Sequence, residues 1–160
     1  MENQIIAGVL MGVGGTVAMD IWALALNRIF GLPMPNWANV GRWSAGVLKG
    51  RVFNDDINAV PSVPGELALG WVVHYGVGIV YGVMLALIMG AGWLAAPTFV
   101  PAWVFGLLTI SAGWFLLHPG MGLGWALSKT PNPWKGRGLG LLAHTMFALG
   151  MWLVAVLLAR

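Results

Sequence analysis

Four long apolar runs occupy most of this sequence, and they constrain its fold more than any other feature. They cover residues 5–30, 66–94, 101–127 and 139–159. A bilayer-spanning helix needs roughly 20 apolar residues, so each run is long enough to span. Only 8% of the residues are charged, whereas a soluble domain carries about 25%. Because so few charges cannot cover a water-soluble surface, we expect an all-α, polytopic integral membrane four-helix bundle. The whole chain, 1–160, is expected to form a single transmembrane domain.

The connections between the runs differ in length and polarity. Residues 31–65 form the longest polar section. Trp37 and Trp43 stand there beside basic residues, as in segments that lie at lipid headgroups, so we expect an interfacial or cytoplasmic loop. An ordinary solvated loop is the alternative. In the third run, Pro119 leaves two outcomes open: the helix kinks and continues to Leu127, or it stops.

The basic residues predict the orientation of the chain. Seven of the eight Lys and Arg residues lie in or beside the first and third connections. Such residues accumulate on the cytoplasmic side, so we expect both termini to lie outside. No basic stripe is interleaved with polar residues, which disfavours a nucleic-acid partner and leaves the lipid bilayer as the expected one.

Each apolar run holds one ionisable side chain at a depth where such groups are costly. These are Asp20, His74, His118 and His144. Ionisable groups inside a membrane usually mark a pathway, a relay or a ligand site. With a rise of about 1.5 Å per residue, Asp20, His74 and His144 fall at similar depths in the cytoplasmic half of their runs. We therefore predict one intramembrane polar cluster.

Small residues share the helix faces of these ionisable groups at a spacing of four. They are Gly8, Gly12 and Thr16 with Asp20, then Gly70, Gly78 and Gly82 with His74, then Gly140 and Ala148 with His144. Small residues mark faces that contact other helices, so the ionisable groups are expected to face the bundle interior. Trp22, Tyr81 and Ser111 are expected to support the cluster, and Arg42 and Arg137 to form its cytoplasmic mouth.

Several kinds of chemistry suit such a cluster, and the sequence leaves them open. Asp20, His74 and His144, with His118 as a fourth, form a ligand set for a divalent transition metal. A bis-histidine haem between His74 and His144 is a second cofactor, and a proton or solute relay needs none. The same groups also serve as hydrogen-bonding glue between helices.

Covalent chemistry has little support in the sequence. The chain has no cysteine, which excludes thiolate metal sites and cysteine nucleophiles. Ser44, Ser62 and Ser128 lie in connections away from the expected histidine layer, so no nucleophile–base pair supports an enzyme.

Short motifs along nearly the whole chain resemble a known family. They are MDxW at 19–22, VGRW at 40–43, GWxxHY at 70–75, PGMG at 119–122, SKTPNP at 128–133 and the late His144. The combination is similar to domain-of-unknown-function family 2938, small bacterial inner-membrane proteins expected to have four helices. The resemblance implies that location, but no reaction or substrate.

The resemblance also bears on the cluster. The positions that match the family's pattern are Asp20, Arg42, Trp43, His74, Tyr75, Gly120 and His144. The residue before Pro119 resembles Gln in the family, so His118 is a departure. The resemblance therefore leaves Asp20, His74 and His144 as the core trio, and it implies that Tyr75 is a further supporting residue.

These observations lead to two hypotheses about function. The first is a small multi-pass membrane protein that holds a metal ion, a proton or a small polar solute at Asp20, His74 and His144. The second is a non-catalytic accessory or assembly subunit, a homo-oligomer or the companion of another membrane protein. Its glycine-rich faces would dock partner helices, with the His and Asp side chains as glue.

Overall fold

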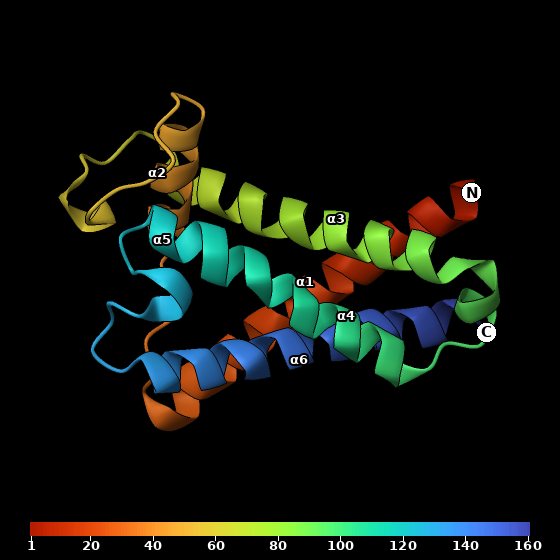
Figure 1. Ribbon diagram of the computed structural model, residues 1–160. Helices are drawn as coiled ribbons and strands as arrows, with labels where there is room; N and C mark the ends of the chain where they lie inside the picture. Colours follow the sequence, from red (N-terminus) through yellow and green to blue (C-terminus); the bar gives the residue numbers. More distant parts are fainter. The chain divides into compact units, whose positions relative to one another are not determined.

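The computed structural model describes residues 1–160, and its regular structure is helical without strands. The long helices are α1 (Glu2–Phe30), α3 (Glu66–Ala95) and α6 (Pro133–Leu158), and a further helical span, Phe99–Gly120, begins with α4 (Phe99–Ala112) (Figure 1). These four segments are long and apolar enough to cross a membrane. The all-helical, four-span architecture expected from the sequence is confirmed.

The chain divides into two compact units. The bundle unit comprises residues 1–34, 75–109 and 141–160, and the connecting unit comprises residues 35–74 and 110–140. Helices α3, α4 and α6 each contribute one part to each unit. The bundle unit therefore contains parts of all four spans, whereas the connecting unit contains α2 (Trp37–Val47) and the short helices.

Helices of the bundle unit meet at glycines. A Cβ atom added to Gly12 of α1 would lie 2.6 Å from the Cα of Ile79 on α3, and it would also collide with the carbonyl oxygen of Gly78. On the other side of α1, a Cβ added to Gly150 of α6 would lie 2.6 Å from the carbonyl oxygen of Gly14. Close backbone approach of this kind is typical of membrane helix pairs. The prediction that the small-residue faces are contact faces is confirmed for α1 and α3.

Larger apolar side chains fill the remaining interior of the bundle unit. Four of them are at most 3% exposed: Met11, Leu85, Phe147 and Met151. They come from α1, α3 and α6, while Ala102 of α4 is fully buried beside them. Small residues at the crossings and large ones between them thus give the unit a continuous core.

The connecting unit has a small hydrophobic core of its own. Val40 of α2, Ile57 of the 3₁₀ helix η1 (Ile57–Ala59) and Met121 are each at most 8% exposed. Two backbone bonds fix the segments together, from Asn54 N to Gly120 O at 3.0 Å and from Ile57 N to Met121 O at 3.1 Å. Val40 and Ile57 thus pack against Met121, which lies more than 60 positions later in the chain. The placement of residues 31–65 at the membrane interface stays a prediction.

The third span stops at Gly120. After α4 the chain continues as a π-helical turn, η2 (Gly113–Leu117), and ends with α5 (His118–Gly120). Pro119 has no N–H for the preceding turn, and wider turns of this kind accommodate such a loss. Gly122 then adopts a left-handed conformation with φ 85°, while Leu123 N donates to His118 O at 2.9 Å. The glycine cap ends the helix, so of the two outcomes expected at Pro119 the structure shows the one in which the helix stops.

The fourth span begins earlier than the apolar run at 139. Helix α6 starts at Pro133, after Asn132, whose side chain accepts a hydrogen bond from Lys135 N at 3.0 Å. Asn is a preferred N-cap and Pro a preferred first helical residue, so the start signal is present in the sequence. Trp134, Lys135 and Arg137 are consequently helical residues rather than loop residues.

We expect Gly12→Ala to lower the free energy of unfolding by about 1–3 kcal/mol, because the new methyl group meets rigid backbone of α3. Gly76→Ala is the matched control, since a Cβ at that position meets nothing within 4 Å. The control should be neutral or stabilising by up to about 1 kcal/mol, because alanine favours helix. Denaturant titration of both variants in detergent by circular dichroism measures the difference. Equal effects would contradict the close approach of α1 and α3.

Candidate functional site

Asp20 is hydrogen-bonded to a tyrosine inside the bundle unit. The hydroxyl of Tyr75 on α3 donates to Oδ2 of Asp20 on α1 at 2.9 Å, and both side chains are half-buried. Asp20 lies four residues from the centre of α1, about 6 Å along the helix axis. A carboxyl group within a span and a tyrosine of a second span thus form one polar pair.

The glycine crossing of α1 and α3 positions this pair. Thr16, one turn before Asp20, is 1% exposed and donates from Oγ1 to Gly12 O at 2.8 Å. A Cβ on Gly78, three residues after Tyr75, would collide with that Thr16 hydroxyl. The pair therefore lies about one helical turn from a point where α1 and α3 are in close contact.

His144 connects α6 to α4 in the same unit. Its Nδ1 lies 3.0 Å from Gly106 O and 3.0 Å from Thr109 Oγ1, and the Thr109 hydroxyl itself donates to Gly106 O at 2.6 Å. A carbonyl oxygen only accepts, so we assign the imidazole proton to Nδ1, shared between the two oxygens. This geometry corresponds to the interhelical glue that the sequence left open for His144.

The other two histidines belong to the connecting unit. His74 stacks on Trp37 of α2, with ring centroids 3.8 Å apart and planes at 24°, and Trp71 lies 5.8 Å from it at a tilt. His118 is half-buried at the end of the third span, and its carbonyl oxygen takes part in the glycine cap. The aromatic contact gives His74 a packing role that its depth alone did not reveal.

The structure does not gather the expected ligands into a metal site. No group of three or more His, Asp or Glu side chains is arranged to hold a metal ion. Asp20 and His144 lie in the bundle unit, whereas His74 and His118 lie in the connecting unit. The trio Asp20, His74 and His144 therefore remains a sequence-based grouping, without support from the geometry for a metal centre.

Arg42 was expected at a cytoplasmic mouth, and its guanidinium is engaged within the connecting unit. It binds both carboxylate oxygens of Glu66, with Nε at 2.9 Å and Nη2 at 2.7 Å. Nη1 donates to the carbonyl oxygens of Ile57 and Val60, both at 3.1 Å. The hydrogen bond to Glu66 raises the pKa of Arg42 above its ordinary value, so the clamp stays charged. Glu66, which the sequence analysis did not identify as a site residue, thus holds the Arg42 side chain in place.

The remaining expected site residues have separate places. Arg137 donates from Nε to Ala126 O at 2.8 Å, and its guanidinium lies 4.7 Å from the centre of the Trp134 ring. Tyr81 packs edge-on against Phe105 and Phe147 in the bundle core. Ser111 is exposed, and the indole nitrogen of Trp22 is buried without a hydrogen-bond partner.

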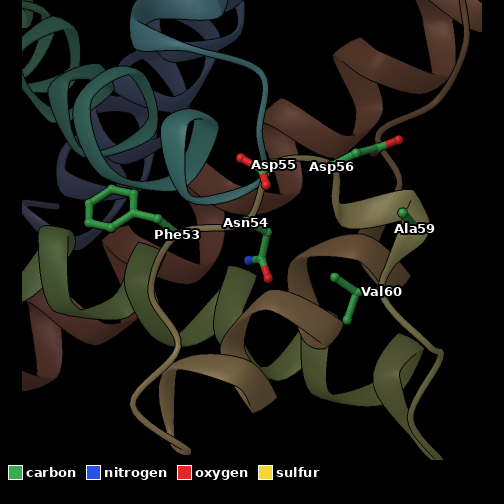
Figure 2. Close-up of a pocket in the computed structure, with 6 residues that line it drawn as sticks. All are labelled: Phe53, Asn54, Asp55, Asp56, Ala59 and Val60. Carbon is green, nitrogen blue, oxygen red and sulfur yellow. The ribbon is translucent and has the colours of Figure 1, made fainter.

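One open hollow of about 440 Å³ lies in the connecting unit, and it does not coincide with any expected site residue. Its lining residues are Phe53, Asn54, Asp55, Asp56, Ala59 and Val60 (Figure 2). Figure 2 shows the carboxylates of Asp55 and Asp56 pointing away from each other. Oδ1 of Asp56 caps η1 by accepting from Asn58 N at 2.9 Å. The hollow therefore lacks converging ligands, and the Asp20–Tyr75 pair remains the candidate site.

The comparisons with known proteins agree with the resemblance drawn from the motifs. The profile of the family described as "Protein of unknown function (DUF2938)" matches residues 9–158. No curated protein and no solved structure matches the chain.

The role of His144 as a helix connector predicts a specific energetic coupling. His144→Leu and Thr109→Val should each lower the free energy of unfolding, by about 0.6–1.7 kcal/mol for the lost interhelical bond. The double variant should lose less than the sum, because both changes remove the same contact. The free energies of unfolding in detergent of the wild type, the two single variants and the double variant together give a double-mutant cycle. Strict additivity would show that the two side chains do not interact.

The clamp at Arg42 predicts local protection of the segment before α3. Arg42→Lys keeps the positive charge, but lysine lacks the planar guanidinium that makes two hydrogen bonds to Glu66. We expect trypsin to cleave after Lys49 and Arg51 several-fold faster in this variant, since residues 51–65 are released. Lys49→Arg, at an exposed position, preserves every trypsin site and should leave the rate unchanged. Equal rates in both variants would exclude the clamp.

Proposed function

We propose that this chain, which belongs to the family DUF2938, is a multi-pass membrane protein that takes up and releases a proton at Asp20. We place it in the bacterial inner membrane with its basic connections on the cytoplasmic side. The observation that carries the proposal is the hydrogen bond from Tyr75 to Asp20 between two spans.

The chemistry of the pair suits proton exchange. A tyrosine hydroxyl donates as well as accepts, so it hydrogen-bonds the carboxyl group in both protonation states. Carboxyl groups inside membrane spans are rare because of their cost, and they recur in proton relays. The rigid crossing at Gly12 and Gly78 holds the pair while the proton moves. The proposal needs no metal, and His144 serves it by fastening α4 to α6.

The packing gives less support to an accessory subunit. That hypothesis relied on glycine-rich faces that dock helices of another protein. Gly12 and Gly78 face each other within this chain, and Gly150 faces Gly14. Since these faces are already occupied, a partner helix would need a different surface.

Proton flux through reconstituted protein tests the proposal. Liposomes with an internal pH dye and an imposed potassium diffusion potential should acidify or alkalinise faster with the wild-type protein than without it. Asp20→Asn should return the rate to that of empty liposomes, because the amide does not ionise. Tyr75→Phe should lower the rate without abolishing it, since the carboxyl group remains.

Glu2→Gln is the matched control for that experiment. It removes the other carboxylate of α1, which lies exposed at the helix start. Its flux should equal that of the wild type. A wild-type rate equal to that of empty liposomes, or unchanged by Asp20→Asn, would refute proton exchange at Asp20.

A further inference from the structure

The positive charge of this protein belongs to the connecting unit. That unit contains six Lys and Arg side chains and three Asp and Glu side chains, whereas the bundle unit contains two of each kind. Of the three acidic groups, Glu66 is neutralised by Arg42. From residue 67 to residue 160 there is no acidic residue at all. The formal net charge of +3 is therefore local rather than spread over the molecule.

Three of these cations and two tryptophans lie within residues 125–137, just before and in the first turns of α6. We call this set the basic rim: Trp125, Lys129, Trp134, Lys135 and Arg137. Trp134 and Trp125 are 78% and 60% exposed, and both lysines are exposed. Because the last span begins at Pro133, its first turn lies where a span meets the headgroup layer.

Contacts within the protein orient the arginine of the basic rim. The Nε bond to Ala126 O and the Trp134 ring hold the guanidinium in place. Its two Nη groups make no hydrogen bond within the protein, so a flat fork of donors remains for a phosphate oxygen pair.

The backbone between Trp125 and Lys129 of the basic rim is held in a costly conformation. Ala126 and Leu127 adopt left-handed φ angles of 46° and 64°, although neither is glycine. Such residues cost about 1–3 kcal/mol each and persist where surrounding contacts enforce them. Here Thr130 Oγ1 donates to Leu127 O at 2.7 Å, and Arg137 holds Ala126. The result is a fixed turn that presents Trp125 outward.

We propose that the basic rim is a binding site for the phosphate headgroup of an anionic phospholipid. Arg137 forks the phosphate, Lys129 and Lys135 add charge, and the two tryptophans lie among the acyl-chain carbonyls beside it. Charge complementarity and the position at a span end favour lipid over a soluble anion. The basic rim shares no residue with the Asp20–Tyr75 pair, so its test does not depend on proton exchange.

Native mass spectrometry of the 160-residue protein released from detergent tests this site. Phosphatidylglycerol and phosphatidylcholine are added at equal concentrations. The wild type should retain phosphatidylglycerol preferentially, and Lys129→Gln/Lys135→Gln should lower that retention about tenfold or more. This double variant leaves Arg137 and its bond to Ala126 intact, so the turn stays folded. Retention should also fall with added salt.

A matched control and a competitor complete the design. Lys49→Gln/Arg51→Gln removes two exposed cations from the same unit and should retain the lipid like the wild type. Equal losses in both double variants would reduce the effect to general charge and overturn the site. Equal retention of phosphatidylcholine would also overturn it. Displacement of the lipid by millimolar inorganic phosphate would identify a soluble anion as the ligand instead.

Discussion

Close approach of helix backbones at glycines is the constraint on which this structure depends. Apolar side chains drive helix association weakly in lipid, because lipid tails are equally apolar. Contact area must then come from backbones that nearly touch, as at Gly12 and Gly78 in the bundle unit. The connecting unit uses the same device, since a Cβ on Gly41 of α2 would collide with the carbonyl oxygen of Glu66 on α3. The Asp20–Tyr75 bond and the Arg42 clamp each lie beside one of these crossings.

The family motifs acquire physical meanings from these contacts. VGRW supplies a core side chain, a close crossing, the clamp to Glu66 and, through Trp43, a hydrogen bond to Val52 O at 2.8 Å. PGMG ends the third span, and its Gly120 carbonyl accepts two bonds from Asn54. Most motif residues thus build the connecting unit. Two contacts bring spans together through an ionisable group: Asp20 with Tyr75 joins α1 to α3, and His144 joins α6 to α4.

Whether a feature of this structure could be predicted from the sequence depends on how close together in the chain its residues lie. The four spans and the small-residue faces were predictable because hydropathy and a spacing of four are properties of single helices. The core of Val40, Ile57 and Met121 was not, because it joins residues up to 81 positions apart. The start of α6 at Asn132-Pro133 was predictable from local cap chemistry, although the surrounding turn residues concealed it. Matched depth grouped Asp20 with His74 and His144, and this grouping stays a prediction, because depth gives no information about which helix faces meet.

The π-helical turn at residues 113–117 sets the rotational phase of everything that follows it in the third span. Such a turn holds one residue more than an α-helical turn. Removing that residue would leave a regular helix of almost the same length, but it would rotate the downstream residues by about 100° about the axis. Met121 would then leave the core of the connecting unit, and Gly120 would turn away from Trp43. The extra residue therefore acts as an angular spacer, which lets the apolar third span end with the face that the connecting unit packs against.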